Sequence, residues 1–439
     1  MPDATSDAQD RWADLGERVD LERLRAVLAE ASPDDVEAAL RRVERDRRPI
    51  SPPPVDGDFY EVCAAFGPEE LRIQKVLRAF FATHVAPIID GYWDRGEFPM
   101  QLVPRFGELV EELYGPYSPD IPIRRSGVLS LELGRGDPSL STFFGVHWGL
   151  CMGSIVRFGS PQQRQRWLPA MYRFEKIGSW ALTEPLHGSD AASGLGTTAT
   201  RRGDTWTLTG EKKWSGNATI ADVNVVWAND TADGQVKGFL VERGTPGYHV
   251  EKVTGKIAKR AIDNVMIRLD DVELHESQRL PGVDSFKDVA GQLAAGRAGV
   301  AWEAVGIALA AYEHALDYCN RRVQFGRPIT AFQLIQTQLV DMLGNVTAML
   351  TMMKRLDELE RRDGTVSAER ASLAKAWCTT KMRETVATAR GIVGGNGILL
   401  EHKIARYFAD AEAVYSYEGS HEMNTLIVGR AITGVSAFV

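Results

Sequence analysis

The fold is decided at residues 205–218, which read TWTLTGEKKWSGNA. This stretch is rich in β-branched and aromatic residues, and three more short runs of this kind follow at 223–227, 238–241 and 265–269. Turn-forming stretches such as Arg202-Gly203-Asp204 separate them. Short strands between turns predict a small antiparallel barrel or sandwich over residues 179–283.

Helical patterns lie on both sides of this region. Upstream, apolar residues repeat at helical spacing after Gly67-Pro68, which marks a helix start, and Pro87 breaks the pattern. Downstream, one long amphipathic helix is predicted from a stripe whose methionines we interpret as core packing; the stripe is Ile335, Leu339, Met342, Val346, Met349, Met353 and Leu356. The chain is therefore predicted to be mainly α with a central β-barrel. Its expected parts are an extension and linker at 1–57, a helical domain at 58–178, the barrel at 179–283 and a helical bundle at 284–439.

Composition bounds the function. The 439 residues are more than one hydrophobic core normally serves, and 44% hydrophobic with 25% charged residues is ordinary for a globular protein. The formal charge of −8 argues against a nucleic-acid surface, and we expect no membrane span. The four cysteines and eight histidines lack metal spacing, so buried thiols and no bound metal are expected. The acidic amino terminus lacks a signal pattern, which favours a cytoplasmic location.

Two loops in the middle region carry groups suited to a polar heterocycle. Residues 178–190 pass from an apolar strand into Thr, Pro, Gly, Ser and Asp, which can bind a ring edge and a phosphate, although a simple turn would look the same. Trp214 can stack on a flat ring, and Ser215-Gly216 lets the backbone approach closely. A tryptophan in a strand is more often part of a core, so both interpretations stay open here.

Three further runs lie in the carboxyl-terminal third. Residues 320–328 join basic residues to Phe325-Gly326, which suits a pyrophosphate or simply ends a helix. Residues 391–397 contain four glycines without a preceding strand, so they are not a dinucleotide fingerprint. Residues 415–424 place the carboxylate of Glu418 between an aromatic run and Gly-Ser, with Ser420 positioned to cap the last helix.

In this order and spacing, the five runs resemble the acyl-CoA dehydrogenase family over roughly residues 58–439. The nearer resemblance is to the branch of short-chain acyl-CoA oxidases and glutaryl-CoA dehydrogenases, through runs such as FQLIQTQLVDMLGNVTAM at 332–349 and YEGSHEMNTLIVGRAITG at 417–434. The resemblance implies the acyl-CoA dehydrogenase fold, with an N-terminal helical domain, a middle β-barrel and a C-terminal four-helix bundle. It also implies a homotetramer, built as a dimer of dimers, that binds FAD.

The resemblance also implies roles for individual residues. Glu418 falls at the position of the catalytic base, and Arg297, Ser189 and Gly419 fall near the substrate. The positions that match FAD contacts are Leu182, Thr183, Gly188, Ser189, Trp214, Ser215, Gly216, Arg322, Phe325, Gln333, Gly391, Gly394, Gly395, Ser420 and Glu422. Of these, Arg322, Phe325, Gln333 and the 391–395 segment are expected to reach the FAD of a neighbouring subunit.

The implied reaction is oxidation of an acyl-CoA thioester to the trans-2-enoyl-CoA. Removal of a proton α to a thioester needs a base in a dry pocket, and the enolate charge must be met by hydrogen bonds. In this family those bonds come from the base's own backbone N–H and a flavin hydroxyl, and flavin N5 accepts the β-hydride. Electrons are expected to pass to an electron-transfer flavoprotein.

Three departures from the family pattern matter. Gly216 stands where many dehydrogenases carry a threonine, Ser141 stands where glutaryl-CoA dehydrogenase carries an arginine, and the glycine-rich segment before the third helix is replaced at 114–122. Gly216 keeps an oxidase that reduces O2 to hydrogen peroxide as the alternative, and Ser141 weakens a dicarboxyl substrate. A DNA-associated, non-catalytic relative or a flavin monooxygenase is a weaker alternative, because Glu418 is retained.

Overall fold

We describe a computed structural model of the chain, which covers residues 26–27, 29–47, 57–119 and 126–437. Most of the predicted extension at 1–57, and part of the 114–122 segment, lie outside the described residues. The chain divides into two units, Met1–Pro54 and Val55–Val439. The described part of the first unit holds helix α3 (Pro33–Arg47).

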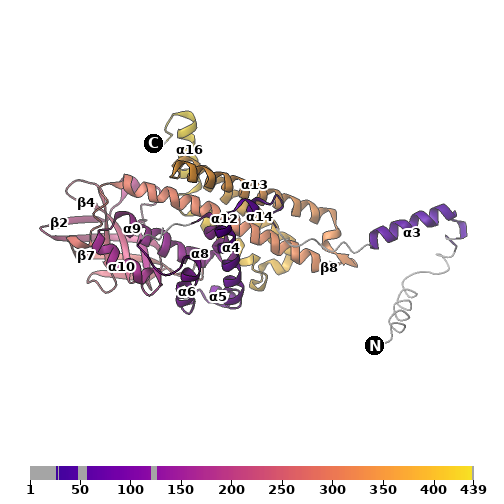
Figure 1. Ribbon diagram of the computed structural model, residues 1–439, viewed down its shortest axis with the longest axis horizontal. Coiled ribbons are helices and arrows are strands. Elements are labelled where there is room, and N and C mark those ends of the chain that lie inside the picture. The colour runs from indigo at the N-terminus through magenta and orange to yellow at the C-terminus, as the bar shows by residue number, and fades with distance from the viewer. Residues whose placement is uncertain (1–25, 28, 48–56, 120–125, 438–439) are drawn as a thin grey trace. The chain divides into compact units, whose positions relative to one another are not determined.

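The second unit begins with short helices (Figure 1). They are α4 (Pro68–Phe80), α5 (Ile89–Arg95), α6 (Leu102–Tyr114), α7 (Gly127–Gly136), α8 (Pro138–Phe144), α9 (Gly153–Phe158) and α10 (Pro161–Tyr172), with the single-turn or π-helical pieces η1 (Val62–Ala65), η2 (Phe81–Val85) and η3 (Gly145–Met152). The predicted start of α4 is confirmed, because the Glu70 side chain accepts the Gly67 N–H at 2.9 Å. Regular α-helix ends at Phe80, and η2 carries the helical turns on to Val85, two residues before Pro87.

The central strands form one sheet. In the part of the chain that the structure describes, seven strands belong to it: β1 (Gly178–Ala181), β2 (Thr198–Arg202), β3 (Thr205–Gly216), β4 (Val223–Asp230), β5 (Val236–Glu242), β6 (Tyr248–Lys252) and β7 (Asn264–His275). Their order is β1-β4-β2-β3-β7-β6, and β5 also pairs with β4. The predicted antiparallel pairing is wrong at β4, because β1 and β2 both pair with it in parallel. The central barrel is thus a half-barrel with a mixed sheet, and short helix α11 (Ala191–Gly194) precedes β2.

The remaining chain is helical. It comprises α12 (Phe286–Arg321), α13 (Gln333–Asp363), α14 (Ala368–Val393), α15 (Ile404–Ser416) and α16 (His421–Thr433), with the hairpin β8 (Val323–Gln324) and β9 (Arg327–Pro328) and the short turns η4 (Glu276–Gln278), η5 (Ile329–Ala331), η6 (Gly394–Ile398) and η7 (Leu400–His402). The predicted stripe of α13 is confirmed as core, since six of its seven members are buried and Ile335 packs against them. In Figure 1, the sheet and the β8–β9 hairpin lie at opposite ends of the helical body.

Glycines let α12 pack tightly against α7. A Cβ on Gly306 would lie 1.9 Å from the Leu131 carbonyl oxygen, and one on Gly134 would lie 2.5 Å from the Glu303 carbonyl oxygen. Such distances are impossible for a side chain, so glycine is required at both contacts. The contact fixes α12, which carries the predicted site residue Arg297 and is followed directly by Arg322, against the N-terminal helices.

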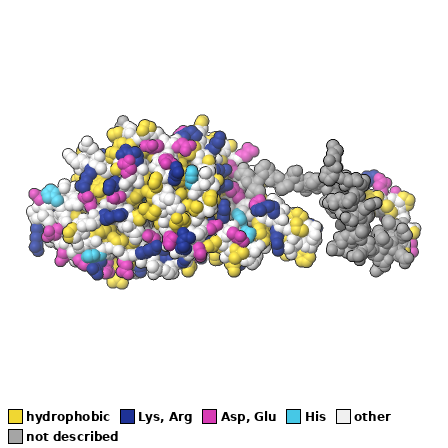
Figure 2. Space-filling view, turned by 90° about the horizontal axis from the view of Figure 1, so that it is seen from below, with side chains coloured by type: hydrophobic (Ala, Val, Ile, Leu, Met, Phe, Trp, Pro, Cys, Tyr) yellow, Lys and Arg dark blue, Asp and Glu magenta, His cyan; other side chains and the backbone are white. Residues whose placement is uncertain are grey.

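Two helical stretches, Pro138–Phe158 and Phe286–Arg321, are long and apolar enough to cross a membrane. However, 67% and 78% of their most apolar windows are buried inside the protein, which is typical of core helices. On the face shown in Figure 2, lysine and arginine side chains are interspersed with acidic ones. Cys151, Cys319 and Cys378 are buried free thiols, and Cys63 is half-buried.

Candidate active site

Glu418 lies in a sharp turn between two helices. Helix α15 ends at Ser416 and α16 begins at His421, and between them Glu418 has a φ of 54° and Gly419 a φ of 83°. Consecutive left-handed residues reverse the chain, and a non-glycine residue adopts this conformation only when its surroundings impose it. Ser420 caps α16 as predicted, because its hydroxyl accepts the Met423 N–H at 3.3 Å.

The carboxylate of Glu418 lies against α12. A Cβ on Gly296 would stand 2.7 Å from Oε2 of Glu418, so the absence of a side chain at Gly296 makes room for the carboxylate. Glu418 is half-buried. The neighbouring Arg297 is also half-buried, its Nε has no hydrogen-bond partner, and burial lowers its pKa while the charge of Glu418 raises it.

A buried lysine of α14 holds the turn that carries Glu418. Lys375 of α14 donates from Nζ to the carbonyl oxygens of Tyr415 at 2.6 Å and Gly419 at 2.9 Å. The Asn424 amide donates to Gly419 and Ser420, both at 2.9 Å. The backbone on both sides of Glu418 is therefore fixed by side chains from α14 and α16.

A second network holds the same turn from the side of α12. The Tyr417 hydroxyl donates to Glu303 Oε2 at 2.7 Å, and Lys259 Nζ donates to Glu303 Oε1 at 2.9 Å. The backbone N–H of Lys259 donates to Asp410 at 2.5 Å, and burial raises the pKa of Asp410 to about 6. Lys259, Glu303 and Asp410 are all buried, so this is a charge network inside the core.

The predicted flavin loop and Trp214 lie side by side at one end of the sheet. The Lys213 N–H donates to Thr183 O at 2.7 Å, and the Ser179 hydroxyl donates to Gly216 O at 2.7 Å. Trp214 has a φ of 68° and its side chain is 50% exposed, so the interpretation of this tryptophan as core is wrong. The neighbouring Ser215 hydroxyl is buried without a partner.

An ion pair braces the same loop. Lys212 donates to Glu184 at 2.7 Å and to Leu182 O at 3.1 Å, and Glu184 also accepts the Gly196 and Thr197 N–H groups. Burial lowers the pKa of Lys212 to about 8, opposed by the charge of Glu184. Leu182 is buried and Thr183 half-buried, whereas Gly188 and Ser189 are exposed at the tip of the loop.

Gly216 does not open a vacant space. A Cβ at this position would lie 3.2 Å from Val146 Cγ2 and 3.5 Å from Ile262 Cδ1. The threonine hydroxyl of many relatives is therefore absent here, but Val146 and Ile262 fill the space beside Gly216. The second departure, Ser141, is buried within α8.

The cofactor positions that were predicted to reach a neighbouring subunit lie at the far end of α12. Arg322 immediately follows α12, twenty-five residues beyond Arg297, which a rise of about 1.5 Å per residue converts to about 37 Å. Phe325 is 93% exposed on the β8–β9 hairpin, and Gln333 is exposed at the start of α13. Gly391, Gly394 and Gly395 are also exposed, and the neighbouring Asn396 donates to the Tyr318 hydroxyl near that end of α12. These positions do not join the Glu418 group within one chain.

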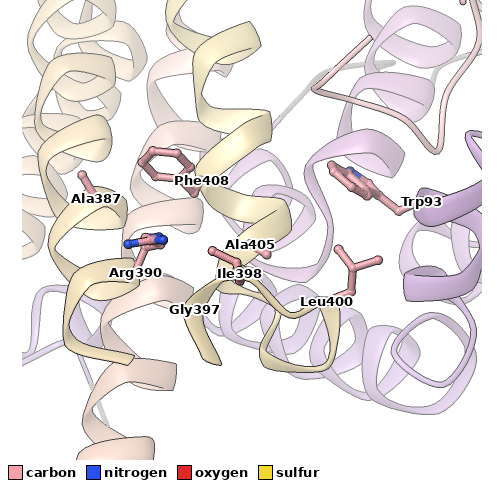
Figure 3. Close-up of a pocket in the computed structure, with 8 residues that line it drawn as sticks. All are labelled: Trp93, Ala387, Arg390, Gly397, Ile398, Leu400, Ala405 and Phe408. Atoms are coloured by element: carbon pink, nitrogen blue, oxygen red, sulfur yellow. The ribbon is translucent and has the colours of Figure 1, made fainter. Parts of the chain in front are cut away.

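A cavity of about 620 Å³ lies beside this glycine segment and not beside Glu418. Figure 3 shows Arg390 and Phe408 on one side and Trp93 on the other, with Ile398 and Leu400 between them. The exposed lining is mostly apolar, with Arg390 as its cation.

The sequence interpretation missed the groups that hold the site. Lys375 and Glu303 lie in helices and Lys259 in a loop, none of them within a recognisable motif, whereas Lys212 lies in the 205–218 run but was not singled out there. Each of the four contacts residues far away in the sequence. Gly296 directly precedes the predicted residue Arg297 in the sequence, but only its contact with Glu418 shows why it is a glycine. In the described part of the chain, no group of three or more His, Cys, Asp or Glu residues could hold a metal ion.

Comparison with known proteins identifies the family. Three family models match: the N-terminal domain of acyl-CoA dehydrogenase at residues 67–175, the middle domain at 179–272 and the C-terminal domain at 286–433. An acyl-CoA dehydrogenase of Bacillus subtilis is 32% identical over 377 residues, which is 83% of this chain and 98% of that protein. The rat mitochondrial short-chain specific acyl-CoA dehydrogenase is 32% identical over 372 residues, 81% of this chain and 88% of that protein.

Solved structures agree. A glutaryl-CoA dehydrogenase from Mycobacterium smegmatis superposes with a TM-score of 0.81 at 37% identity, covering 86% of this chain and 97% of that one. Another structure of a glutaryl-CoA dehydrogenase from that organism, in complex with FADH2, gives 0.83 at 31% identity, covering 87% and 98%. The predicted fold and family are confirmed: this chain belongs to the acyl-CoA dehydrogenase family of FAD-dependent oxidoreductases.

Proposed function

We propose that the chain oxidises the Cα–Cβ bond of an acyl-CoA thioester to the trans-2-enoyl-CoA, with Glu418 as the catalytic base. One observation carries this proposal. A single half-buried carboxylate is held over Gly296, in a turn whose backbone is fixed by Lys375 and Asn424. A base that must remove a weakly acidic proton needs such fixed geometry, because small misplacements cost large factors in rate.

The residues around Trp214 fit the isoalloxazine ring of FAD. A half-exposed indole beside a buried, unpartnered Ser215 hydroxyl offers a stacking surface and an unused hydrogen-bonding group. Leu182, Thr183 and Gly216 would hold the ring edge, and Gly188 and Ser189 the exposed side of the same loop. When bound, FAD supplies the acceptor for the hydride that leaves Cβ.

Arg297 and Gly419 are proposed to border the substrate. A Cβ on Gly419 would lie 3.6 Å from Arg297 Nε, so the two residues face each other beside the base. The positive charge of Arg297 would stabilise negative charge that develops near Glu418. Because the buried Ser141 offers no cation, we propose a monocarboxyl acyl group as substrate.

We propose that a second copy of the chain completes the cofactor site. Arg322, Phe325, Gln333 and the Gly391–Gly395 segment are too far from Glu418 to contact the same flavin within one chain. At the far end of α12, the side chains of Phe325 and Leu334 are 93% and 79% exposed. Such exposed apolar side chains indicate a surface that another protein chain covers. Ser420 and Glu422 at the start of α16 would provide further FAD contacts, and the assembly would be a homotetramer.

We propose an electron-transfer flavoprotein as the acceptor. The fold is shared, at a TM-score of 0.78 and 27% identity, with a chain solved in work on the electron-transferring flavoprotein of Acidaminococcus fermentans. Val146 and Ile262 border Gly216, which supports a dehydrogenase over an oxidase because space for oxygen is not opened there. Mixing the substrate-reduced protein with air separates the two functions, since the flavin of an oxidase is reoxidised rapidly and forms hydrogen peroxide.

We propose a cytoplasmic location.

The substitution Glu418→Gln tests the base. The variant is expected to bind FAD with wild-type stoichiometry and to lose bleaching of the flavin by short-chain acyl-CoA in anaerobic stopped-flow measurements. The amide keeps the size of the side chain and cannot accept the proton. Normal bleaching in an FAD-loaded E418Q protein would refute the role of Glu418.

A further inference from the structure

Lys375 is buried in a way that differs from the other buried lysines near the site. Lys212 and Lys259 each donate to a carboxylate, at 2.7 Å and 2.9 Å. The acceptors that hold Lys375 are two backbone carbonyls, although its side chain is completely buried. A buried cation without a close counter-ion is expensive, so its presence needs a reason.

The two carbonyls are those that bracket Glu418. Tyr415 O belongs to the last turn of α15 and Gly419 O follows the left-handed pair, so one ammonium group joins the two sides of the turn. The last carbonyls of a helix lack intrahelical partners and attract cations. Lys375 therefore fixes the backbone from which the Glu418 side chain projects.

The charges around Lys375 come from three neighbouring elements. Burial lowers the pKa of Lys375 to about 8, the charge of Glu418 raises it, Arg297 of α12 lowers it and Glu422 of α16 raises it. From α15, the Tyr415 ring lies 5.9 Å from Nζ, and among the described residues α13 adds no charged group to this set. Near neutral pH the group is still mostly protonated, and Glu418 is its largest electrostatic partner.

We propose that Lys375 is a positioning residue for the base: its ammonium group clamps the turn through two carbonyls and its positive charge keeps the Glu418 carboxylate ionised. This inference rests on the proposed role of Glu418. A base in a half-buried pocket tends to take up a proton, since burial disfavours its charged form. The cation of Lys375 acts against this tendency without forming a tight ion pair that would hold the carboxylate away from the substrate.

The test is the pH dependence of flavin reduction in Lys375→Met. With saturating short-chain acyl-CoA, the acidic limb of the rate profile is expected to move to higher pH by about one unit, because an opposite charge near a carboxylate lowers its pKa by about that much or more. Lys375→Arg keeps the charge and is expected to keep the wild-type acidic limb. Lys237→Met is the control for loss of a buried lysine in another part of the molecule, since Lys237 is also buried, donates to the Asp284 carbonyl at 3.0 Å and pairs with Asp233 at 3.1 Å.

A merely structural lysine would change stability and FAD content without moving this limb. If the methionine variant does not load FAD, Lys375→Gln, whose amide can still donate to one carbonyl, provides the neutral side chain. An unmoved acidic limb in whichever neutral variant loads FAD would overturn the inference. E418Q measured in parallel separates the two proposals: bleaching in E418Q refutes the base, whereas an inactive E418Q with an unmoved limb in the neutral variant refutes only Lys375.

Discussion

The turn that carries Glu418 is held by two regions with different electrostatics. On the α12 side, Lys259 and Glu303 form a direct ion pair that ends at the Tyr417 hydroxyl. On the α14 side, Lys375 donates to backbone carbonyls. A neutralised network has little field left to act on its neighbours, whereas a cation held by carbonyls retains most of its field. We therefore expect the first region to control stability and the second to control the ionisation of the base.

The largest expected effect is loss of stability on Lys259→Met. Removal of one partner leaves Glu303 buried without its counter-ion, which costs about 3–5 kcal/mol of unfolding free energy. Urea unfolding of the FAD-loaded protein measures this loss. The control is Lys237→Met, which breaks the more exposed ion pair of Lys237 with Asp233 and should cost less. The comparison of the two regions fails if K259M is as stable as K237M, or if its acidic limb moves as far as that of K375M.

Asp410 gives the α12 side a pH dependence. Burial raises its pKa to about 6, so its folded-state pKa lies above its ordinary value of 3.8. Folding therefore favours the protonated form of Asp410. Its stabilising contribution to the free energy of unfolding is fully present below about pH 4 and is lost as the pH rises through 6. A pKa difference of about two units between the folded and unfolded states corresponds to up to about 3 kcal/mol of stabilisation.

Asp410→Asn removes this titration while its amide oxygen can still accept from Lys259 N and Trp93 Nε1. Between pH 4 and 6.5 the wild-type melting temperature is expected to fall relative to that of D410N. Parallel curves for the two proteins over this range would show that the Asp410 carboxyl does not change its protonation there.

Gly296→Ala separates the position of the carboxylate from both networks. The new Cβ would lie 2.7 Å from Oε2 of Glu418, and the carboxylate can swing away because it is the end of a flexible side chain. Stability and FAD content should change little, while flavin reduction slows about 100-fold, or about 2.7 kcal/mol in barrier. Ala298→Gly on the same helix is the control for altered helix propensity. An unchanged reduction rate in G296A would mean that the carboxylate works from another position.

The sequence predicted the parts of this molecule that have local signals. The strand at 205–209, the start of α4 at Gly67-Pro68 and the cap at Ser420 each depend on neighbouring residues, and all three are confirmed. The parallel pairing at β4 was missed because it joins segments that are far apart in the chain, and strand runs alone do not specify their partners. Glu418 was selected through its resemblance to a family position. Lys375 could not be selected from the sequence, because a lysine within a helix is usually exposed. Only the fold brings it into contact with the turn that carries Glu418.

The smallest expected effect is that of Tyr417→Phe, which disconnects the turn from the α12 network without removing a charge. The hydroxyl bond to Glu303 at 2.7 Å is lost, but Lys259 still neutralises this carboxylate, so we expect a cost of about 1.5 kcal/mol. Because Lys375 still holds the carbonyls of Tyr415 and Gly419, the acidic limb of flavin reduction should stay near its wild-type position. If Y417F instead moves that limb as far as K375M does, the ionisation of Glu418 depends on both regions equally. The assignment of stability to the α12 side and of base ionisation to the α14 side would then be wrong.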